Sequence, residues 1–380
     1  MKPLTPDTLT TWPEIDSKVI RENDPQASAG LFARNARHYK APFDEPITGN
    51  HLMKILEYND VDPLSVLHLT MLALDFPFTP EHAAHIRSAD PRPFPCFTVN
   101  AVEDDRVLGQ MGIFRLPMVS TEGREDVGGI WAVSTHPQHS GRGIASRLLE
   151  ESHARMCDAG LRFSTLGTNR YRSAYKLYQR HGYVDMNVWA TALAPWETAH
   201  QPTRLCAQPP GAALPAQVPQ AQVSESKGPE GFDFVEKIFE NNASDYLGFA
   251  WRHTPFVPLR DKVKLEDIWI LWENGTPVGY VFAHKNKLML EISIQLLRMD
   301  IDASEAVAAV VSEIKSSYVQ VAMSRPSDIA SLQRAGWQVA HPNWGAFMVK
   351  PLVSDVTIED ARRLFGIGTD RFLISWLDTT

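Results

Sequence analysis

The sequence predicts an α/β protein (mixed α+β sheet) with two domains, each a central mixed β-sheet flanked by helices. Three observations support this. Strand and helix signals follow one another in the same order twice along the chain. A loop with two close glycines, Gly141 and Gly143, joins a strand to a helix in the first half. The length of 380 residues exceeds that of one typical domain, about 100–200 residues.

The first domain is predicted over residues 51–195, after an N-terminal extension of residues 1–50 without sustained periodicity. Two helix starts are marked by Asp62-Pro63 and Thr79-Pro80, because each pairs an N-cap residue with proline at the first helical position. Alternating or apolar runs predict strands at 53–57, 97–101, 106–115, 129–133, 161–166 and 183–192. Apolar residues at helical spacing predict helices from 144 and at 174–178.

The second half begins after a linker predicted at residues 196–231, which are rich in Pro, Ala and Gln. A second domain is predicted over 232–350, with a hairpin turn at Asn274-Gly275. Its other predicted elements are helices at 232–250, 303–314 and 328–335 and strands at 268–273, 276–283, 288–294, 318–323 and 347–350. Residues 351–380 form a C-terminal tail, with a helix from Thr357 to Gly366 and an apolar run that packs on one of the domains.

An internal repeat relates the two halves. Residues 179–183, Gln-Arg-His-Gly-Tyr, recur as Gln-Arg-Ala-Gly-Trp at residues 333–337, an offset of 154. The same offset places the two loop glycines on Gln295 and Leu297. The second domain is therefore predicted to keep the fold and to lack the glycine loop. An unrelated α+β domain with a chance match is the alternative.

The composition describes a folded protein with 44% hydrophobic and 22% charged residues. A net charge of −8 argues against a nucleic-acid partner and is compatible with a cationic amine substrate. Cys96, Cys157 and Cys206 are spaced for neither a zinc site nor a disulfide framework. The first residues lack the apolar core of a signal peptide, and no run approaches about 18 apolar residues. We expect a cytoplasmic protein without a membrane or metal partner.

The stretch 133–149 carries the chemistry in this sequence. Its glycines allow a tight turn between strand and helix, and the free N–H groups of the first helical turn attract an anion. The spacing fits neither a dinucleotide G-x-G-x-x-G motif nor a G-K-S/T nucleotide loop. The stretch thus predicts a phosphate site of another kind, with an ordinary glycine-rich turn as the alternative.

The loop resembles the coenzyme A loop of the GNAT acyltransferases, Arg/Gln-x-x-Gly-x-Gly/Ala, with Ser140, Gly143 and Ala145 on the motif positions. Ser140 departs from the usual Arg or Gln, and Arg142 is a nearby cation. The segment Ala174–Tyr183 resembles the family's A-x-x-L-Y-x-x-x-G-F/Y helix. The predicted order of strands and helices also matches the GNAT arrangement.

The resemblance implies an N-acetyltransferase that carries acetyl directly from acetyl-CoA to a primary amine of a small molecule or peptide. Tyr178 would donate a proton to the departing thiolate, and packing of its helix is the alternative role. The implied coenzyme-binding residues are Val133, Thr135, Ser140, Gly141, Arg142, Gly143, Ile144, Ala145 and Asn169. Val133 and Thr135 would pair with the pantetheine arm through their backbone groups.

Several points stay open at this level. The general base is one of His136, Glu125, Asp126 and the terminal carboxylate of Thr380, or the amine loses its proton through water. Similar tandem layouts occur in aminoglycoside-type acetyltransferases and in mycothiol synthases, which imply a polycationic or an amino-sugar acceptor. A protein that binds acyl-CoA as a sensor, without turnover, is the alternative function.

Overall fold

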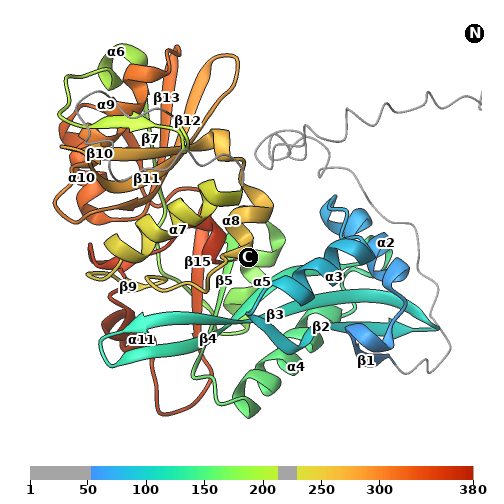
Figure 1. The fold of residues 1–380 in the computed structure, drawn as a ribbon. Coiled ribbons are helices and arrows are strands. Elements are labelled where there is room, and N and C mark those ends of the chain that lie inside the picture. The colour runs from blue at the N-terminus through green and yellow to red at the C-terminus, as the bar shows by residue number, and fades with distance from the viewer. Residues whose placement is uncertain (1–52, 213–228, 380) are drawn as a thin grey trace, which may run out of the picture. The chain divides into compact units, whose positions relative to one another are not determined.

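The computed structural model describes residues 53–212 and 229–379. The predicted extension at residues 1–50 lies outside the described residues, as do the middle of the predicted linker and Thr380. The described chain forms two mixed β-sheets with helices against them (Figure 1). The predicted α/β class with mixed sheets is confirmed.

The first sheet has the strand order β1-β2-β3-β4-β5-β15-β6, with β9 and β16 attached beside β3. β4 and β5 run parallel, and the neighbouring pairs are antiparallel. Its strands are β1 Lys54–Glu57, β2 Pro93–Glu103, β3 Arg106–Ser120, β4 Gly123–Thr135, β5 Phe163–Asn169, β6 Val184–Asp185, β9 Leu247–Gly248, β15 Gly345–Pro351 and β16 Phe372–Leu373.

Four helices of the first half pack on this sheet: α2 Pro63–Leu74, α3 Pro80–Ala89, α4 Ile144–Asp158 and α5 Ser173–Arg180. The two predicted starts are confirmed, because Asp62 accepts hydrogen bonds from the first turn of α2 and Thr79 does so for α3. α4 buries Ile144 and Leu148 in a cluster with α5, on the face opposite the cluster that contains α2 residues. Two 3₁₀ turns, Tyr58–Asp60 and Pro137–His139, complete this half.

The second sheet has the order β14-β7-β13-β12-β11-β10-β8. The predicted hairpin at Asn274-Gly275 joins β10 to β11. Its strands are β7 Ala190–Pro195, β8 Cys206–Gln208, β10 Ile268–Glu273, β11 Thr276–Lys285, β12 Met289–Leu297, β13 Tyr318–Met323 and β14 Gln338–Ala340. The helices of this part of the chain are α6 Trp196–Ala199, α7 Pro229–Asn242, α8 Val257–Lys262, α9 Ala303–Glu313 and α10 Pro326–Arg334, with a 3₁₀ turn at Leu265–Asp267.

The C-terminal tail begins with α11 Ile358–Phe365, which has the predicted capping box at Thr357 and ends at Gly366. Its apolar run then packs as predicted, because β16 pairs with β9 and the following residues lie in the core. The last turn is the 3₁₀ helix Trp376–Asp378.

The two halves exchange strands, so the predicted boundaries at residues 195 and 350 do not separate the sheets. β7, predicted to close the first domain, pairs with β13 and β14 of the second sheet. β15, predicted to close the second, lies between β5 and β6 of the first sheet. The predicted linker also contributes α6 and β8. Each sheet therefore needs residues from both halves of the sequence.

None of the helices in the described ranges 53–212 and 229–379 is long and apolar enough to cross a membrane.

A buried polar group couples α4 to the first sheet. The Tyr183 hydroxyl lies 2.9 Å from His153 Nε2 and 2.7 Å from Ser164 Oγ, and Ser164 donates to the Gly128 carbonyl. Burial, with the nearby positive charge of Lys350, lowers the pKa of His153 to about 3. His153 is therefore neutral in the folded protein at ordinary pH.

This burial predicts an acid sensitivity. Unfolded histidine has a pKa of about 6.5, so only the unfolded chain binds this proton between pH 6.5 and 3. The stability from neutral His153 is present above pH 6.5 and is lost as the pH falls, by up to about 1.4 kcal/mol per pH unit. Urea unfolding from pH 7 to 4 should show a shallower pH dependence for His153→Gln than for the wild type. Equal slopes would contradict the assignment.

Candidate functional site

The site begins where β4 parts from β5. The two strands pair only from Gly128 with Ser164 to Ile130 with Leu166. Beyond that point β4 contains a bulge, with Ala132 at φ 48°, and continues along β3 alone. In the described structure, the edge of β4 that carries Val133 and Thr135 therefore has no β5 partner. An extended ligand could add to this edge through backbone hydrogen bonds.

The glycine loop follows this edge directly. Gly141 and Gly143 have φ angles of 83° and 75°, in the left-handed region that favours glycine. Gly143 is the N-cap of α4, and no side chain caps the helix. The N–H groups of Ile144 and Ala145 belong to the first turn, where an α-helix supplies no acceptor. With the helix dipole, they form a site suited to a phosphate group.

Arg142, the cation predicted beside this loop, is held by an acidic partner. The Arg142 guanidinium makes two hydrogen bonds to the Glu103 carboxylate, at 2.8 and 2.9 Å, and its Nη1 also lies 2.8 Å from His139 Nδ1. The hydrogen bonds that Arg142 donates to Glu103 raise the pKa of Arg142. The charge of Arg142 is thus compensated by Glu103 at the end of β2. Ser140, Gly141 and Gly143 are exposed, and the Ser140 N–H donates to the Pro137 carbonyl, so an anion would meet the exposed glycines and the start of α4.

Tyr178 lies on α5 and is 5% exposed. Burial raises the pKa of its hydroxyl, which therefore keeps its proton at neutral pH. Two observations place it near the loop. Tyr178 packs in one cluster with Ile144 of the first turn of α4, and His181, at the end of α5, has Nε2 3.0 Å from Ser146 Oγ. No hydrogen bond joins the Tyr178 hydroxyl to another described residue, so it can donate to a ligand.

Asn169 ends β5 on the other side of the gap. Its Oδ1 accepts a hydrogen bond of 2.8 Å from the Tyr171 backbone, so this oxygen is engaged in a local turn. Arg170 is paired with Asp185 and does not face the gap as a free charge. A contact from Asn169 to the coenzyme stays a prediction, best served by its amide nitrogen.

The structure separates the base candidates. Glu125 is held by Arg162 through hydrogen bonds of 2.7 and 2.8 Å, and Asp126 lies 3.5 Å from Arg115. Both acids stand at the start of β4, and the loop follows its end, about 30 Å away at strand rise. Of the described candidates only His136 lies beside the loop, where its Nδ1 accepts from the Gln138 backbone. Thr380 lies outside the described residues.

The tail contributes one residue that the sequence does not indicate. Thr379 is 6% exposed and packs against Gly167, just beyond the paired part of β5. A methyl group at Gly167 would lie 2.7 Å from Thr379 Oγ1, so glycine at this position leaves room for the Thr379 side chain. A close approach between residues 212 positions apart leaves no local pattern in the sequence, and only the single glycine within β5 hints at it.

The second sheet repeats the bulge but not the loop. Gln295 and Leu297 lie inside β12 and not in the loop, so the fixed offset misplaced them. The loop before α9 is instead Arg298–Asp302, and Asp302 caps α9 by accepting from Ser304 N at 2.9 Å. Since this helix start already holds a carboxylate of its own, it repels a second anion.

Comparisons with known proteins agree with this geometry. Residues 62–185 match a family described as acetyltransferase (GNAT) domain. Among solved structures, a probable N-acyltransferase from Enterococcus faecalis V583 is similar with a TM-score of 0.60 and 14% identity, over 80% of this chain and 73% of that one.

Two other similar structures are GCN5-related N-acetyltransferases. The one from Anabaena variabilis ATCC 29413 has a TM-score of 0.55 and 14% identity, and covers 80% of this chain and 73% of its own. The one from Kribbella flavida has a TM-score of 0.51 and 15% identity, and the match covers 79% of this chain and 71% of that one. A search of curated proteins found no match. The likeness in fold therefore extends well beyond the matched family domain.

The loop geometry predicts that Gly143→Val removes coenzyme binding. Valine at this φ strains the backbone by about 1–3 kcal/mol and places a branched side chain above the helix start. Gly160→Val is a matched control, because Gly160 has φ 77°, equally open surroundings, and a position about 22 Å away past the other end of α4. Calorimetry with acetyl-CoA should show binding lost in the first variant and kept in the second. An unchanged affinity of Gly143→Val for acetyl-CoA would show that the loop does not bind the coenzyme.

The capped α9 predicts one coenzyme per chain. Titration of the full chain with acetyl-CoA should saturate at one equivalent, and Gly143→Val should leave no residual binding. The full chain is required because residues 232–380 alone would lack β7 and β8 of the second sheet. Saturation of the wild type at two equivalents of acetyl-CoA, or of Gly143→Val at one, would show that the second sheet binds coenzyme.

Proposed function

We propose that the protein transfers acetyl from acetyl-CoA directly to a primary amine of a small molecule or peptide, and the match of residues 62–185 to the GNAT acetyltransferase family supports this. The observation that carries the proposal is the gap between β4 and β5 beside an uncapped, glycine-led helix. Backbone groups of Val133 and Thr135 would hold the pantetheine arm, and the start of α4 would hold the pyrophosphate.

Tyr178 is the proposed general acid. A thiolate of pKa about 8.5 leaves more readily when a phenol donates a proton to it. Burial raises the pKa of Tyr178, so the proton is present throughout the neutral range. The proposed reaction forms one amide bond and breaks one thioester bond, with the proton lost by the amine balanced by the one the thiolate gains. No metal is required.

The acceptor is proposed as a primary amine of a small molecule or peptide, which would meet the coenzyme in the gap bordered by β4, β5 and the tail. A cytoplasmic location is proposed on the three free cysteines. A sensor that binds acyl-CoA without turnover is the second candidate. It has no need of a protonated phenol beside the loop, so Tyr178 favours the enzyme.

Tyr178→Phe tests this role directly. Losing one positioned proton donor typically lowers the rate about 10²–10⁴-fold. Since the hydroxyl is used only in the transition state, kcat and kcat/KM should fall together while coenzyme affinity stays unchanged. Release of free thiol with a panel of amines measures both constants. A variant with wild-type turnover, under conditions where chemistry limits the rate, would make Tyr178 structural.

Tyr175→Phe is the matched control on the same helix. The Tyr175 hydroxyl donates to Asp185 at 3.0 Å, so its loss should lower the free energy of unfolding by about 1–3 kcal/mol. Turnover should not change, because this hydroxyl is committed to Asp185. Equal kinetic losses in the two variants would point to a general disturbance of α5.

A further inference from the structure

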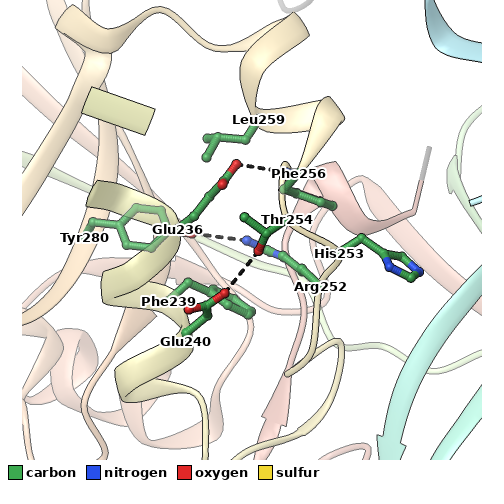
Figure 2. A pocket seen from close by; sticks show the side chains of 9 residues that line it. All are labelled: Glu236, Phe239, Glu240, Arg252, His253, Thr254, Phe256, Leu259 and Tyr280. Atoms are coloured by element: carbon green, nitrogen blue, oxygen red, sulfur yellow. Dashed lines mark hydrogen bonds between the residues drawn. The ribbon is translucent and has the colours of Figure 1, made fainter. Parts of the chain in front are cut away.

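Arg252 is the most heavily engaged cation of the second half. Its side chain is 7% exposed and lies between two aromatic rings, with its guanidinium carbon 4.1 Å from the centre of Phe239 and 4.4 Å from that of Phe256. Its Nη1 donates to the Tyr280 hydroxyl at 3.1 Å. These residues line a pocket between α7 and β11, the strand that contains Tyr280, and Figure 2 shows the Arg252 side chain in it. The rings and the hydroxyl fix the guanidinium in one orientation.

The remaining donors of Arg252 bind the tail. Nε and Nη2 donate to the two oxygens of Asp378 at 2.9 Å each, and Nη2 also lies 3.2 Å from Ser375 Oγ. Asp378 in turn accepts from the Ser375 backbone at 2.7 Å and closes the last turn of the chain. The Asp378 side chain is 2% exposed, so breaking the pair would leave its negative charge buried without a counter-ion.

The residue after Asp378 reaches the candidate site. Side chains alternate along β5, and Leu166 packs with Ile144 of α4 while Phe163 packs in the opposite cluster. Gly167 shares the face of Phe163, so Thr379 packs on β5 on the side opposite α4. A coenzyme held at the start of α4 would lie on the other side of the sheet. An amine that approaches β5 from the side opposite α4 would meet Thr379.

We propose that Arg252 is a positioning residue that fixes the tail through Asp378, so that Thr379 forms the acceptor wall of the site on β5. This inference rests on the proposed transfer to an amine. Under this proposal the second half of the chain contributes no coenzyme site. Its role is to position Thr379, which the amine contacts when it binds. The affinity for the coenzyme therefore does not depend on the Arg252–Asp378 pair, which we call the clamp. The kcat/KM for the amine does depend on it.

Arg252→Lys tests the clamp in the full chain. Lysine keeps the charge but lacks the fork that binds both Asp378 oxygens. Hydrogen exchange of the backbone at residues 375–379 should become at least tenfold faster, and kcat/KM for the amine should fall at least tenfold. Acetyl-CoA affinity should stay within twofold. Arg162→Lys is the control, since Arg162 makes a two-oxygen pair with Glu125 at the start of β4, about 30 Å from the loop.

A second variant disturbs the same contact from β5. The added methyl of Gly167→Ala would displace Thr379 and leave the Arg252 pair intact. We expect a similar loss of kcat/KM for the amine, partly restored in the double variant Gly167→Ala, Thr379→Ala, which removes Oγ1. Such a rescue would not occur if Gly167 merely stabilised β5.

The outcomes separate the two proposals. Faster exchange at residues 375–379 with unchanged kinetics would overturn the positioning role, and so would unchanged exchange in Arg252→Lys. If acetyl-CoA binds but no amine is turned over, the proposed function fails, and the exchange comparison still shows whether Arg252 holds the tail.

Discussion

The one extra residue in the β4 bulge is the constraint on which the site depends. Parallel pairing with β5 stops at Ile130, and the backbone beyond it stays paired to β3 alone. Ala132 adopts a left-handed conformation there, at a cost of about 1–3 kcal/mol for a residue other than glycine. Stacking of the preceding Trp131 on Phe114, with ring centres 5.0 Å apart, contributes to holding the bend. Without the bulge, β5 would use the backbone groups that a ligand needs.

The exchange of strands makes the far side of the gap depend on the second half. β15 pairs with β5 along its whole length and supports the residues that have no β4 partner. The tail then packs on the same strand at Gly167. The second half can therefore affect the width of the gap whether or not it binds a coenzyme itself.

Local features of the fold were predictable because they depend on neighbours in sequence. The caps at Asp62 and Thr79 and the left-handed glycines of the loop follow from nearby residue types. Sheet membership was not predictable, because the alternation of residues 183–192 fits either sheet equally well. The partner of Arg142 is 39 residues away, and nothing in the loop indicates Glu103. The fixed repeat offset failed because the two loops differ in length.

The second sheet shows how a ligand position can be closed without loss of the fold. β12 keeps the bulge, so Leu297 has the place in register that Thr135 has in β4. A strand edge left without a ligand would bury unpaired backbone groups, which is costly. Here the Tyr246 hydroxyl donates to the Leu297 carbonyl, and Arg325 lies 2.6 Å from that hydroxyl. A side chain of the chain itself thus satisfies the edge, so a ligand could pair with Leu297 only by displacing Tyr246.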